Sequence, residues 1–199
     1  MSALLAIVAA YLIGSIPFGY LLAKLTTGQD VRTKGSGNIG ATNVLRTAGR
    51  GAGIATLVLD IAKGVVAVWL AGWLTNDNPG WMADAALAAM AGHSFPVFLK
   101  FKGGKAVATF IGAFGYLMPL PMLAVLVVFL VTMVATRYVS AASVMAAAAF
   151  PFGVWLILHP TLTETLVSVI AAGFIIYRHK PNMDRIRAGT EPVFRWGIS

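Results

Sequence analysis

Long apolar runs separated by short polar segments dominate the pattern along the chain. A run of about 20 apolar residues can cross a bilayer as one helix, and five runs here approach or reach that length. They cover residues 3–23, 51–74, 81–99, 138–158 and 161–177. Each run predicts a transmembrane helix. Gly14, Ser15 and Pro17 interrupt the first run, so we expect a kink there.

The apolar stretch between Lys105 and Arg137 differs because Pro119 and Pro121 break it near its middle. Two prolines this close together make one continuous helix unfavourable. The two arms, of about 13 and 15 residues, are each shorter than a full span at about 1.5 Å per residue. We therefore predict a hairpin of two short helices. With the five longer runs, the hairpin makes an all-α, polytopic membrane bundle of seven transmembrane helices.

Composition supports a membrane protein with a single domain over residues 1–199. The chain is 58% hydrophobic and 11% charged, with a mean hydropathy of +0.81, whereas a soluble domain carries about a quarter charged residues. No Lys or Arg precedes the first run, which is typical of a retained span rather than of a cleaved signal peptide. The chain has no cysteine, which excludes disulfides and thiolate metal sites.

The placement of the basic residues predicts the topology. If Met1 lies outside and seven helices cross the membrane, fourteen of the fifteen Lys and Arg residues fall in inner segments, and Lys63 lies within a span. The outer turns, at residues 75–80, 119–121 and 159–160, contain none. Cytoplasmic loops of membrane proteins carry such an excess of cations. We therefore predict an outer N-terminus and a cytoplasmic C-terminus, and the net charge of +8 implies no nucleic-acid partner.

A segment rich in glycine and small polar residues, at positions 35–46, follows the first run. Glycine permits positive φ angles and lets a ligand approach the backbone, while the short polar side chains supply donors and acceptors. Arginine adds a forked cation that suits phosphate oxygens. We predict an anion-binding pocket here, with an ordinary polar loop as the alternative. The candidate binding residues are Ser36, Gly37, Asn38, Thr42, Asn43 and Arg46.

A second basic, glycine-rich segment, residues 100–105, falls on the same predicted cytoplasmic face. Gly103, Gly104 and Lys105 precede a predicted helix start, and the N–H groups of such a turn can hold a phosphate beside a lysine. The nucleotide P-loop pattern is absent, and a plain turn with positive-inside lysines is the alternative. Two such segments favour a ligand with more than one phosphate, or two phosphorylated ligands.

The cytoplasmic segments hold few acids, namely Asp30, Asp184 and Glu191, and none of these forms a closely spaced pair. The chain also lacks a G-x-S-x-G motif and a His-rich metal spacing. We therefore predict no metal and no cofactor. Acyl transfer from an already activated donor is compatible with such a site. Phosphate is a good leaving group, and positioning with fixed positive charge can supply most of the barrier reduction.

Two polar features lie inside the predicted spans. Asp60 and Lys63 are three residues apart on one helical face, so they can form an ion pair. We favour a structural pair over a catalytic one, although intramembrane charges are often functional. His93, near the end of the third run, is more typical of a packed, hydrogen-bonded side chain than of a ligand.

Three motifs along the chain resemble those of one known family. They are Gly35-Ser36-Gly37-Asn38 with Gly40-Ala41-Thr42-Asn43, Lys102-Gly103-Gly104-Lys105 with Val107-Ala108-Thr109, and Ile176-Tyr177-Arg178-His179 with Asn182. Together they are similar to the cytoplasmic motifs of the bacterial acyl-phosphate:glycerol-3-phosphate acyltransferases, the PlsY family. The similarity covers essentially the whole chain, including its length and motif order. Ala106 stands where many members have glycine, a change expected to relax the loop slightly.

The resemblance implies transfer of a fatty acyl group from acyl phosphate to the 1-hydroxyl of glycerol 3-phosphate, giving lysophosphatidic acid and phosphate. It further implies a monomer in the bacterial inner membrane, in contact with membrane lipid, with its active site on the cytoplasmic face and no cofactor. Residues implied to surround phosphate are Ser36, Asn38, Gly103, Gly104, Lys105 and Thr109. Arg46 and Lys105 would hold glycerol phosphate, and Ser143, His179 and Asn182 would line the reacting end.

Two questions stay open at this point. The hydroxyl proton could go to His179, the cytoplasmic side chain with a pKa suited to general-base work, or to a substrate phosphate. A transporter of organic phosphates is the competing function, but it needs polar groups continuing to the outer side, and the spans hold few. A membrane anchor would leave the glycine-rich loops unexplained.

Overall fold

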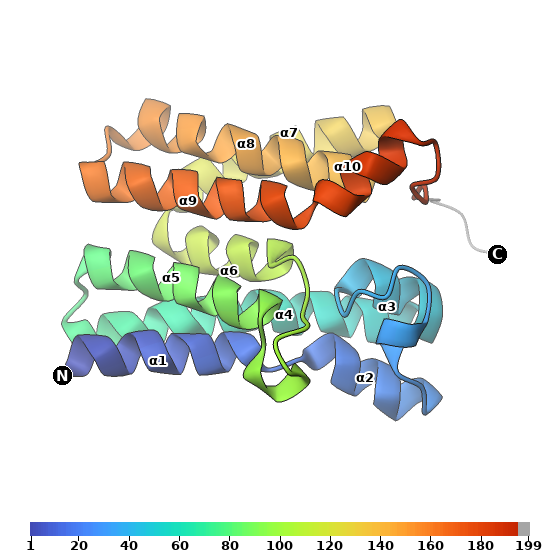
Figure 1. Cartoon of the computed structure of the whole chain (residues 1–199). Coiled ribbons are helices and arrows are strands. Elements are labelled where there is room, and N and C mark those ends of the chain that lie inside the picture. Colours follow the sequence, from blue (N-terminus) through green and yellow to red (C-terminus); the bar gives the residue numbers. More distant parts are fainter. Residues whose placement is uncertain (195–199) are drawn as a thin grey trace. The chain divides into compact units, whose positions relative to one another are not determined.

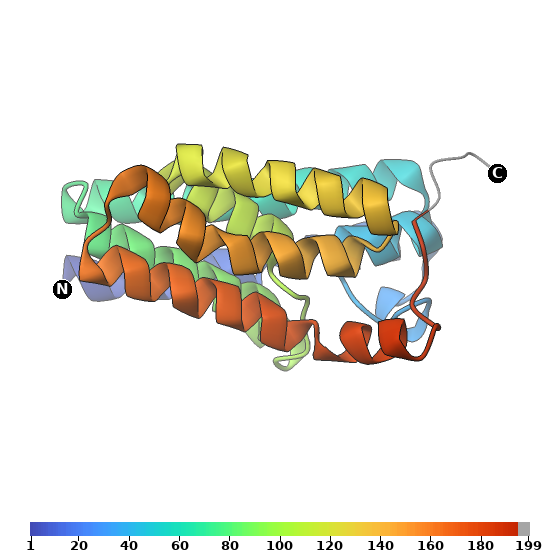
Figure 2. The ribbon, with the colours of Figure 1, turned by 90° about the horizontal axis from the view of Figure 1, so that it is seen from above.

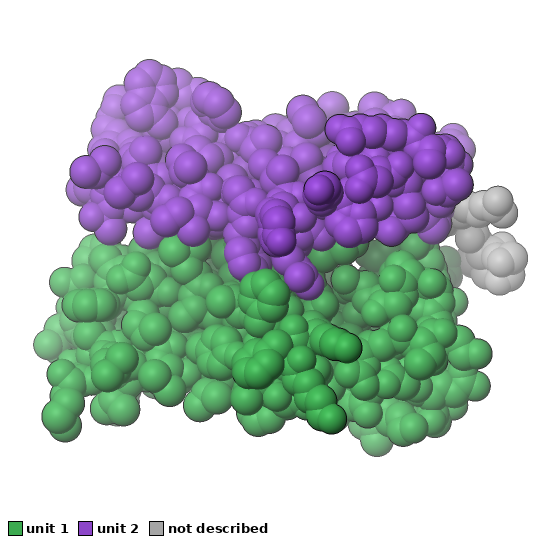
Figure 3. Space-filling view, viewed as in Figure 1, with its two compact units in different colours: residues 1–117 green, residues 118–199 purple. Residues whose placement is uncertain are grey.

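The computed structural model describes residues 1–194, and over this part of the chain all regular elements are helices. They group into two compact units, Met1–Leu117 and Met118–Ser199 (Figures 1 and 3). The predicted all-α architecture is therefore confirmed. The single domain predicted over residues 1–199 stays a prediction, and Arg195 of the basic tail lies outside the described residues.

The first unit begins with a broken helix. Helix α1 (Ser2–Ser15) and helix α2 (Phe18–Thr27) are separated at Ile16 and Pro17, because proline lacks an N–H group and disfavours helical geometry in the residue before it. The predicted kink is thus a complete break. The unit continues with α3 (Ala41–Ala48), α4 (Arg50–Thr75), α5 (Pro79–Ser94) and α6 (Val107–Leu117), and α4 packs against all the other α-helices of this unit.

Small residues let these helices approach closely. Gly14 of α1 lies against the backbone of Ala89 on α5, and Gly64 of α4 lies against the carbonyl of Thr109 on α6. Gly112 of α6 makes the reciprocal contact with the α4 backbone. A Cβ at any of these glycines would overlap the facing helix, so the sequence needs glycine there for packing, as membrane helix interfaces generally do. This packing holds the first turn of α6 against the middle of α4.

Two parts of the first unit differ from the prediction. Helix α5 ends at Ser94 rather than at residue 99, because Pro96 follows and the chain turns through a short 3₁₀ helix, η2 (Val97–Leu99). Helix α3 was not predicted. Only eight residues long and strongly amphipathic, it lacks the apolar run by which the longer helices are recognised in the sequence.

The second unit contains α7 (Pro119–Thr136), α8 (Val139–Leu158), α9 (Leu162–Arg178) and α10 (Lys180–Arg187). Helix α8 packs against both α7 and α9 and lies between them in the view of Figure 2. The predicted break near Pro119 is confirmed. Helix α7 reaches 18 residues, more than expected, because Pro119 and Pro121 occupy its first turn, where a missing N–H costs no helical hydrogen bond.

Five stretches of the described chain are long and apolar enough to cross a membrane. They are Ser2–Thr27, Arg50–Thr75, Pro79–Leu99, Pro119–Thr136 and Val139–Leu158. Helices α6, with 11 residues, and α9, with 17, are shorter. The number of seven spans and the orientation of the termini therefore stay predictions.

Candidate phosphate-binding loops and proton acceptor

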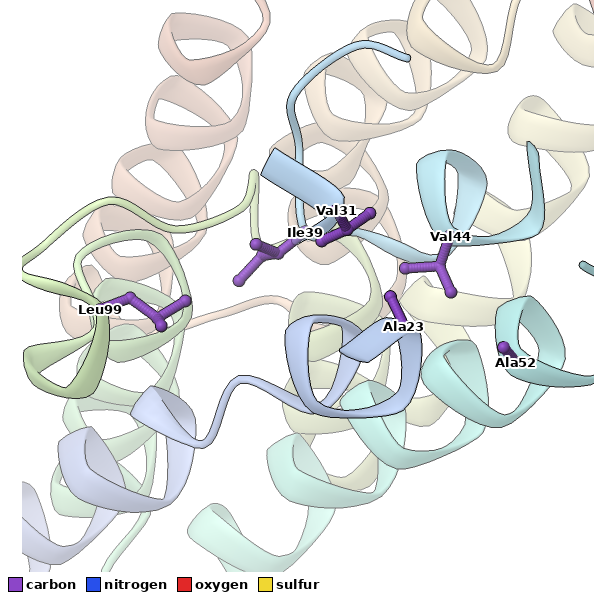
Figure 4. Packing of buried hydrophobic residues seen from close by; sticks show 6 residues of the cluster. All are labelled: Ala23, Val31, Ile39, Val44, Ala52 and Leu99. Atoms are coloured by element: carbon purple, nitrogen blue, oxygen red, sulfur yellow. The ribbon is translucent and has the colours of Figure 1, made fainter. Parts of the chain in front are cut away.

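Both glycine-rich segments rest on one buried apolar cluster in the first unit (Figure 4). Val31, Ile39 and Val44 come from the first segment or its flanks, and Leu99 comes from η2, directly before the second segment. Ala23 of α2 and Ala52 of α4 complete this anchor cluster. Burial of these side chains fixes the first segment and the start of the second segment against the same cluster. Two segments that are far apart in sequence are thereby held close together.

The first segment is organised by the side chain of Asn43, which is 2% exposed. Its Nδ2 donates to the carbonyls of Val31 (3.2 Å), Lys34 (3.1 Å) and Asn38 (2.8 Å). Its Oδ1 accepts the backbone N–H of Ser36 at 2.9 Å. The amide is therefore engaged with the loop backbone on both of its atoms, and it holds the loop rather than facing a ligand.

The other candidate binding residues of this segment lie in the loop that Asn43 holds and on helix α3. Gly35 and Gly37 adopt positive φ angles of 55° and 70°, which is the conformation that favours glycine. Asn38 Oδ1 accepts the N–H of Gly40 at 2.7 Å, just before α3 begins. The side chain of Ser36 is exposed and that of Thr42 is half-buried on the first turn of α3. Arg46 lies on the last turn of α3 and is exposed.

In the second segment, the backbone amides of the two glycines donate to residues of α5. The N–H of Gly103 donates to the carbonyl of Ser94 at 3.1 Å, and the N–H of Gly104 donates to the carbonyl of His93 at 3.0 Å. These amides are thus engaged inside the protein, and a role of the two glycines in binding phosphate stays a prediction. A Cβ at Gly103 would overlap the His93 carbonyl and Pro96, so glycine serves close packing here.

The start of α6 supplies the donors that the two glycines do not. The first N–H groups of a helix lack acceptors within the helix and carry the positive end of its dipole. Lys105 lies just before this helix, and Thr109 lies in its first turn. Thr109 is fully buried, and its Oγ1 has no hydrogen-bond partner in the described chain. Together these groups favour an anion.

Ala106 joins Lys105 to α6 in the left-handed region, with a φ of 60°. That conformation costs a non-glycine residue about 1–2 kcal/mol. The expectation that alanine relaxes the loop is therefore wrong, because alanine adds strain where glycine would not. The surrounding packing imposes the conformation, since Ala106 is completely buried.

In the second unit, His179 lies at the junction of α9 and α10 and is 3% exposed. Its Nδ1 is 2.8 Å from the carbonyl oxygen of Ile175. A carbonyl can only accept a hydrogen bond, so Nδ1 carries the proton and the neutral ring has its lone pair on Nε2. The backbone therefore selects the tautomer that can accept a proton at Nε2.

Glu191 holds a candidate site residue, a role that the sequence did not indicate. Its Oε1 accepts hydrogen bonds from Asn182 Nδ2 (2.7 Å) and Ser140 Oγ (2.8 Å), and its Oε2 accepts one from Arg185 Nε (2.7 Å). Burial raises the pKa of this carboxyl, but the three hydrogen bonds outweigh burial and hold the pKa below its usual range. Glu191 thus clamps Asn182 toward α8. Ser143, also on α8, donates instead to the carbonyl of Val139 at 2.8 Å.

The structure therefore gathers the candidates in two groups. Those of the first two motifs lie in the first unit around the anchor cluster, and His179, Asn182 and Ser143 lie in the second unit. These features define the class of protein as a polytopic α-helical membrane protein whose basic loops suit phosphorylated ligands.

Comparison with known proteins is more specific. A family model described as glycerol-3-phosphate acyltransferase matches residues 4–189. The glycerol-3-phosphate acyltransferase of Geotalea daltonii is 51% identical over 194 residues, covering 98% of this chain and 98% of that protein. The one from Desulforamulus reducens is 47% identical over 93% of this chain and 92% of its own length.

Solved structures agree with this assignment. The crystal structure of PlsY (YgiH), an integral membrane glycerol 3-phosphate acyltransferase, in its glycerol 3-phosphate form aligns with a TM-score of 0.92 and 37% identity, over 98% of this chain and 96% of that one. The chain belongs to the glycerol-3-phosphate acyltransferase family. It is an integral membrane acyltransferase, the predicted resemblance is confirmed, and the transporter alternative is not favoured.

Proposed function

We propose that this acyltransferase takes its acyl group from acyl phosphate and gives it to the 1-hydroxyl of glycerol 3-phosphate. The products are lysophosphatidic acid and inorganic phosphate, as in the first acylation step of phospholipid synthesis. The observation that carries the proposal is the start of α6, where Lys105, the helix N-terminus and the unpartnered Thr109 hydroxyl form an anion-binding group. The crystal structures of PlsY, described as glycerol 3-phosphate and lysophosphatidic acid forms, support the acceptor and the product.

The first unit would bind the phosphates. Lys105, Thr109 and the first amides of α6 would hold one phosphate, and Ser36 and Asn38 would add donors from the neighbouring loop. Arg46 would bind glycerol phosphate through its forked guanidinium, since it is exposed on α3. Gly103, Gly104 and Asn43 would act indirectly, because their polar groups already hold the loops in shape.

The transfer itself needs one bond exchange. The glycerol hydroxyl oxygen attacks the acyl carbonyl carbon, the bond from that carbon to the phosphate oxygen breaks, and phosphate leaves with the bonding electrons. The hydroxyl proton passes to Nε2 of His179, in the tautomer selected by Ile175. Asn182, oriented by Glu191, would hydrogen-bond the reacting groups, and Ser143 would line that end.

The choice of donor can be tested directly. Purified protein given acyl phosphate and glycerol 3-phosphate should release phosphate and form lysophosphatidic acid in equal amounts. Acyl-CoA and acyl carrier protein thioesters should support no transfer under the same conditions. Transfer from a thioester but not from acyl phosphate would overturn the proposed donor and leave the family assignment intact.

For the membrane arrangement, we propose seven crossing helices in the inner membrane of a bacterium, with both glycine-rich loops and α10 on the cytoplasmic side. Support comes from the five long apolar stretches and from the distribution of basic residues. Helix α6, at about 17 Å, would be short for a bilayer and would need to lie within the bundle to cross.

Cysteine labelling tests this arrangement, and the absence of natural cysteines gives a clean background. Cysteines replacing Asn78 or Thr161 should react with an impermeant thiol reagent added to intact cells. Cysteines replacing Thr33, Lys102 or Arg187 should react only after the cells are opened. Labelling of the second set from outside would place the proposed phosphate loops on the wrong side.

Arg46→Ala should raise the KM for glycerol 3-phosphate by about 10- to 100-fold, because a charge-assisted contact with phosphate contributes roughly 1.5–3 kcal/mol. Steady-state kinetics at saturating acyl phosphate would measure the change. Arg50→Ala is the matched control, since it removes another exposed arginine four residues further along, at the start of α4. An equal effect in both variants would point to general attraction of anions rather than to a specific contact.

A further inference from the structure

Three ionisable side chains lie buried within the helices of the first unit. Asp60 and Lys63 belong to α4, and His93 belongs to α5, with exposures of 2%, 4% and 4%. The predicted ion pair is confirmed, since Asp60 Oδ1 lies 2.8 Å from Lys63 Nζ. His93 Nδ1 lies 3.7 Å from the same carboxylate oxygen. Such groups are costly inside a membrane protein and are retained where they do something specific.

Two members of this cluster, Lys63 and His93, contact residues at places where the helical structure is interrupted. Lys63 Nζ donates at 2.9 Å to the carbonyl of Ile16, which lies where α1 ends before Pro17. At the other end, the carbonyl of His93 accepts the N–H of Gly104. The imidazole ring also lies directly against Gly104, because a Cβ there would overlap Nε2 of His93. The cluster therefore touches the phosphate loop next to Lys105.

The same turn of α4 also contacts the other side of that loop. Gly64, which follows Lys63, packs against the carbonyl of Thr109 in the first turn of α6. The chain from Gly103 to Thr109 thus lies between two supports, the His93 ring and the α4 backbone. A shift of Asp60 or His93 would move the residues that flank Lys105 on its N-terminal side.

We propose that His93, whose ring lies beside the Asp60–Lys63 ion pair, is a positioning residue that sets the geometry of the loop from Gly103 to Lys105 for phosphate binding. This inference rests on the proposed phosphate-binding role of the loop. None of the three side chains needs to contact substrate. Their effect passes through the contact between the His93 ring and Gly104. A displacement of the loop by about 1 Å would weaken substrate binding and slow catalysis.

The ring contact allows a direct test by a double-mutant cycle. Gly104→Ala places a methyl group against the ring, His93→Ala removes the ring, and the double variant gives the methyl group the vacated space. We expect each single variant to weaken glycerol 3-phosphate binding by about 10- to 100-fold, measured by calorimetry on purified protein. The double variant should bind more tightly than Gly104→Ala alone.

Gly173→Ala is the control, because a Cβ at that helical glycine has no neighbour within 4 Å. It should bind glycerol 3-phosphate as the unmodified protein does. The proposal would be overturned if the losses of binding free energy for glycerol 3-phosphate in the two single variants simply added in the double variant. Full binding by Gly104→Ala would overturn it as well. Binding of glycerol 3-phosphate requires no acyl donor, so this result and the outcome of the donor test can be told apart.

The ion pair is tested by replacing both charges together. Removing one charge alone would leave the other buried without its partner and could unfold the protein. Asp60→Asn combined with Lys63→Met keeps the side-chain sizes and the net charge. We expect this double variant to bind glycerol 3-phosphate about tenfold more weakly, at a melting temperature that shows it is folded. Unchanged binding would show that the Asp60–Lys63 pair does not help to position the loop. If the variant does not fold, the double-mutant cycle of Gly104 and His93 still tests the proposal.

Discussion

Replacing His179 by asparagine should lower kcat by about 10²–10⁴-fold, the usual contribution of a general base, with little change in KM. The asparagine amide can take the place of Nδ1 and keep the hydrogen bond to the Ile175 carbonyl, so the junction of α9 and α10 should remain folded. The variant lacks Nε2, where the selected tautomer has its lone pair. Steady-state kinetics and thermal unfolding of the purified protein measure the two effects.

His179→Gln is the matched variant, because its longer side chain reaches toward the position of Nε2. A glutamine amide can form a hydrogen bond there but cannot accept the proton. If His179 is the base, both variants should show the same large fall in kcat, because neither amide can accept the proton. Recovery of activity in the glutamine variant would assign His179 to hydrogen bonding and leave a substrate phosphate as the proton acceptor.

Asn43→Asp should reduce kcat/KM by about 100-fold or more and loosen the first glycine-rich segment. The substitution keeps the size of the side chain but replaces the Nδ2 donor by an oxygen that faces three carbonyl oxygens. Each lost hydrogen bond costs about 1 kcal/mol, and a carboxylate facing carbonyls adds repulsion. Ser36 and Asn38, which we propose contact phosphate, then lose the support of the loop, and this is expected to raise the KM for the phosphorylated substrates.

Asn38→Asp is the control for the fold of this loop. Asn38 uses its oxygen to accept the N–H of Gly40, and a carboxylate can do the same. Limited trypsin cleavage after Lys34 should therefore accelerate in Asn43→Asp but not in Asn38→Asp. Equal cleavage in the two variants would mean that the amide donor of Asn43 does not hold the loop.

The helical architecture could be predicted because it depends on local pattern. An apolar run of bilayer length forms a helix wherever it lies, since a chain in lipid must satisfy its backbone hydrogen bonds within itself. Pro17 and Pro119 mark breaks by their own chemistry. The pairing of Asp60 with Lys63 followed from helical periodicity alone. Even the three motifs were visible, because clusters that combine glycine with small polar and basic residues stand out between the apolar runs.

What each motif residue does could not be predicted in the same way. The sequence suggested that the amides of Gly103 and Gly104 bind phosphate, yet they donate to residues of α5. Asn43 looked like a ligand and is instead the centre of a loop. In each case the polar group hydrogen-bonds to a partner that tertiary folding brings near. The spacing of residues along the sequence does not reveal that partner.

By itself, then, the sequence determined the class of this protein, its long apolar helices, their breaks at proline and the three motifs. The tertiary structure alone decided which polar groups are engaged and which face outward. Glu191 shows why: it joins Ser140, 51 residues away, to Asn182, and no local pattern marks that contact. Helix formation is governed by neighbours within one or two turns. The partner of a side chain is governed by packing between elements, which exists only once the chain has folded.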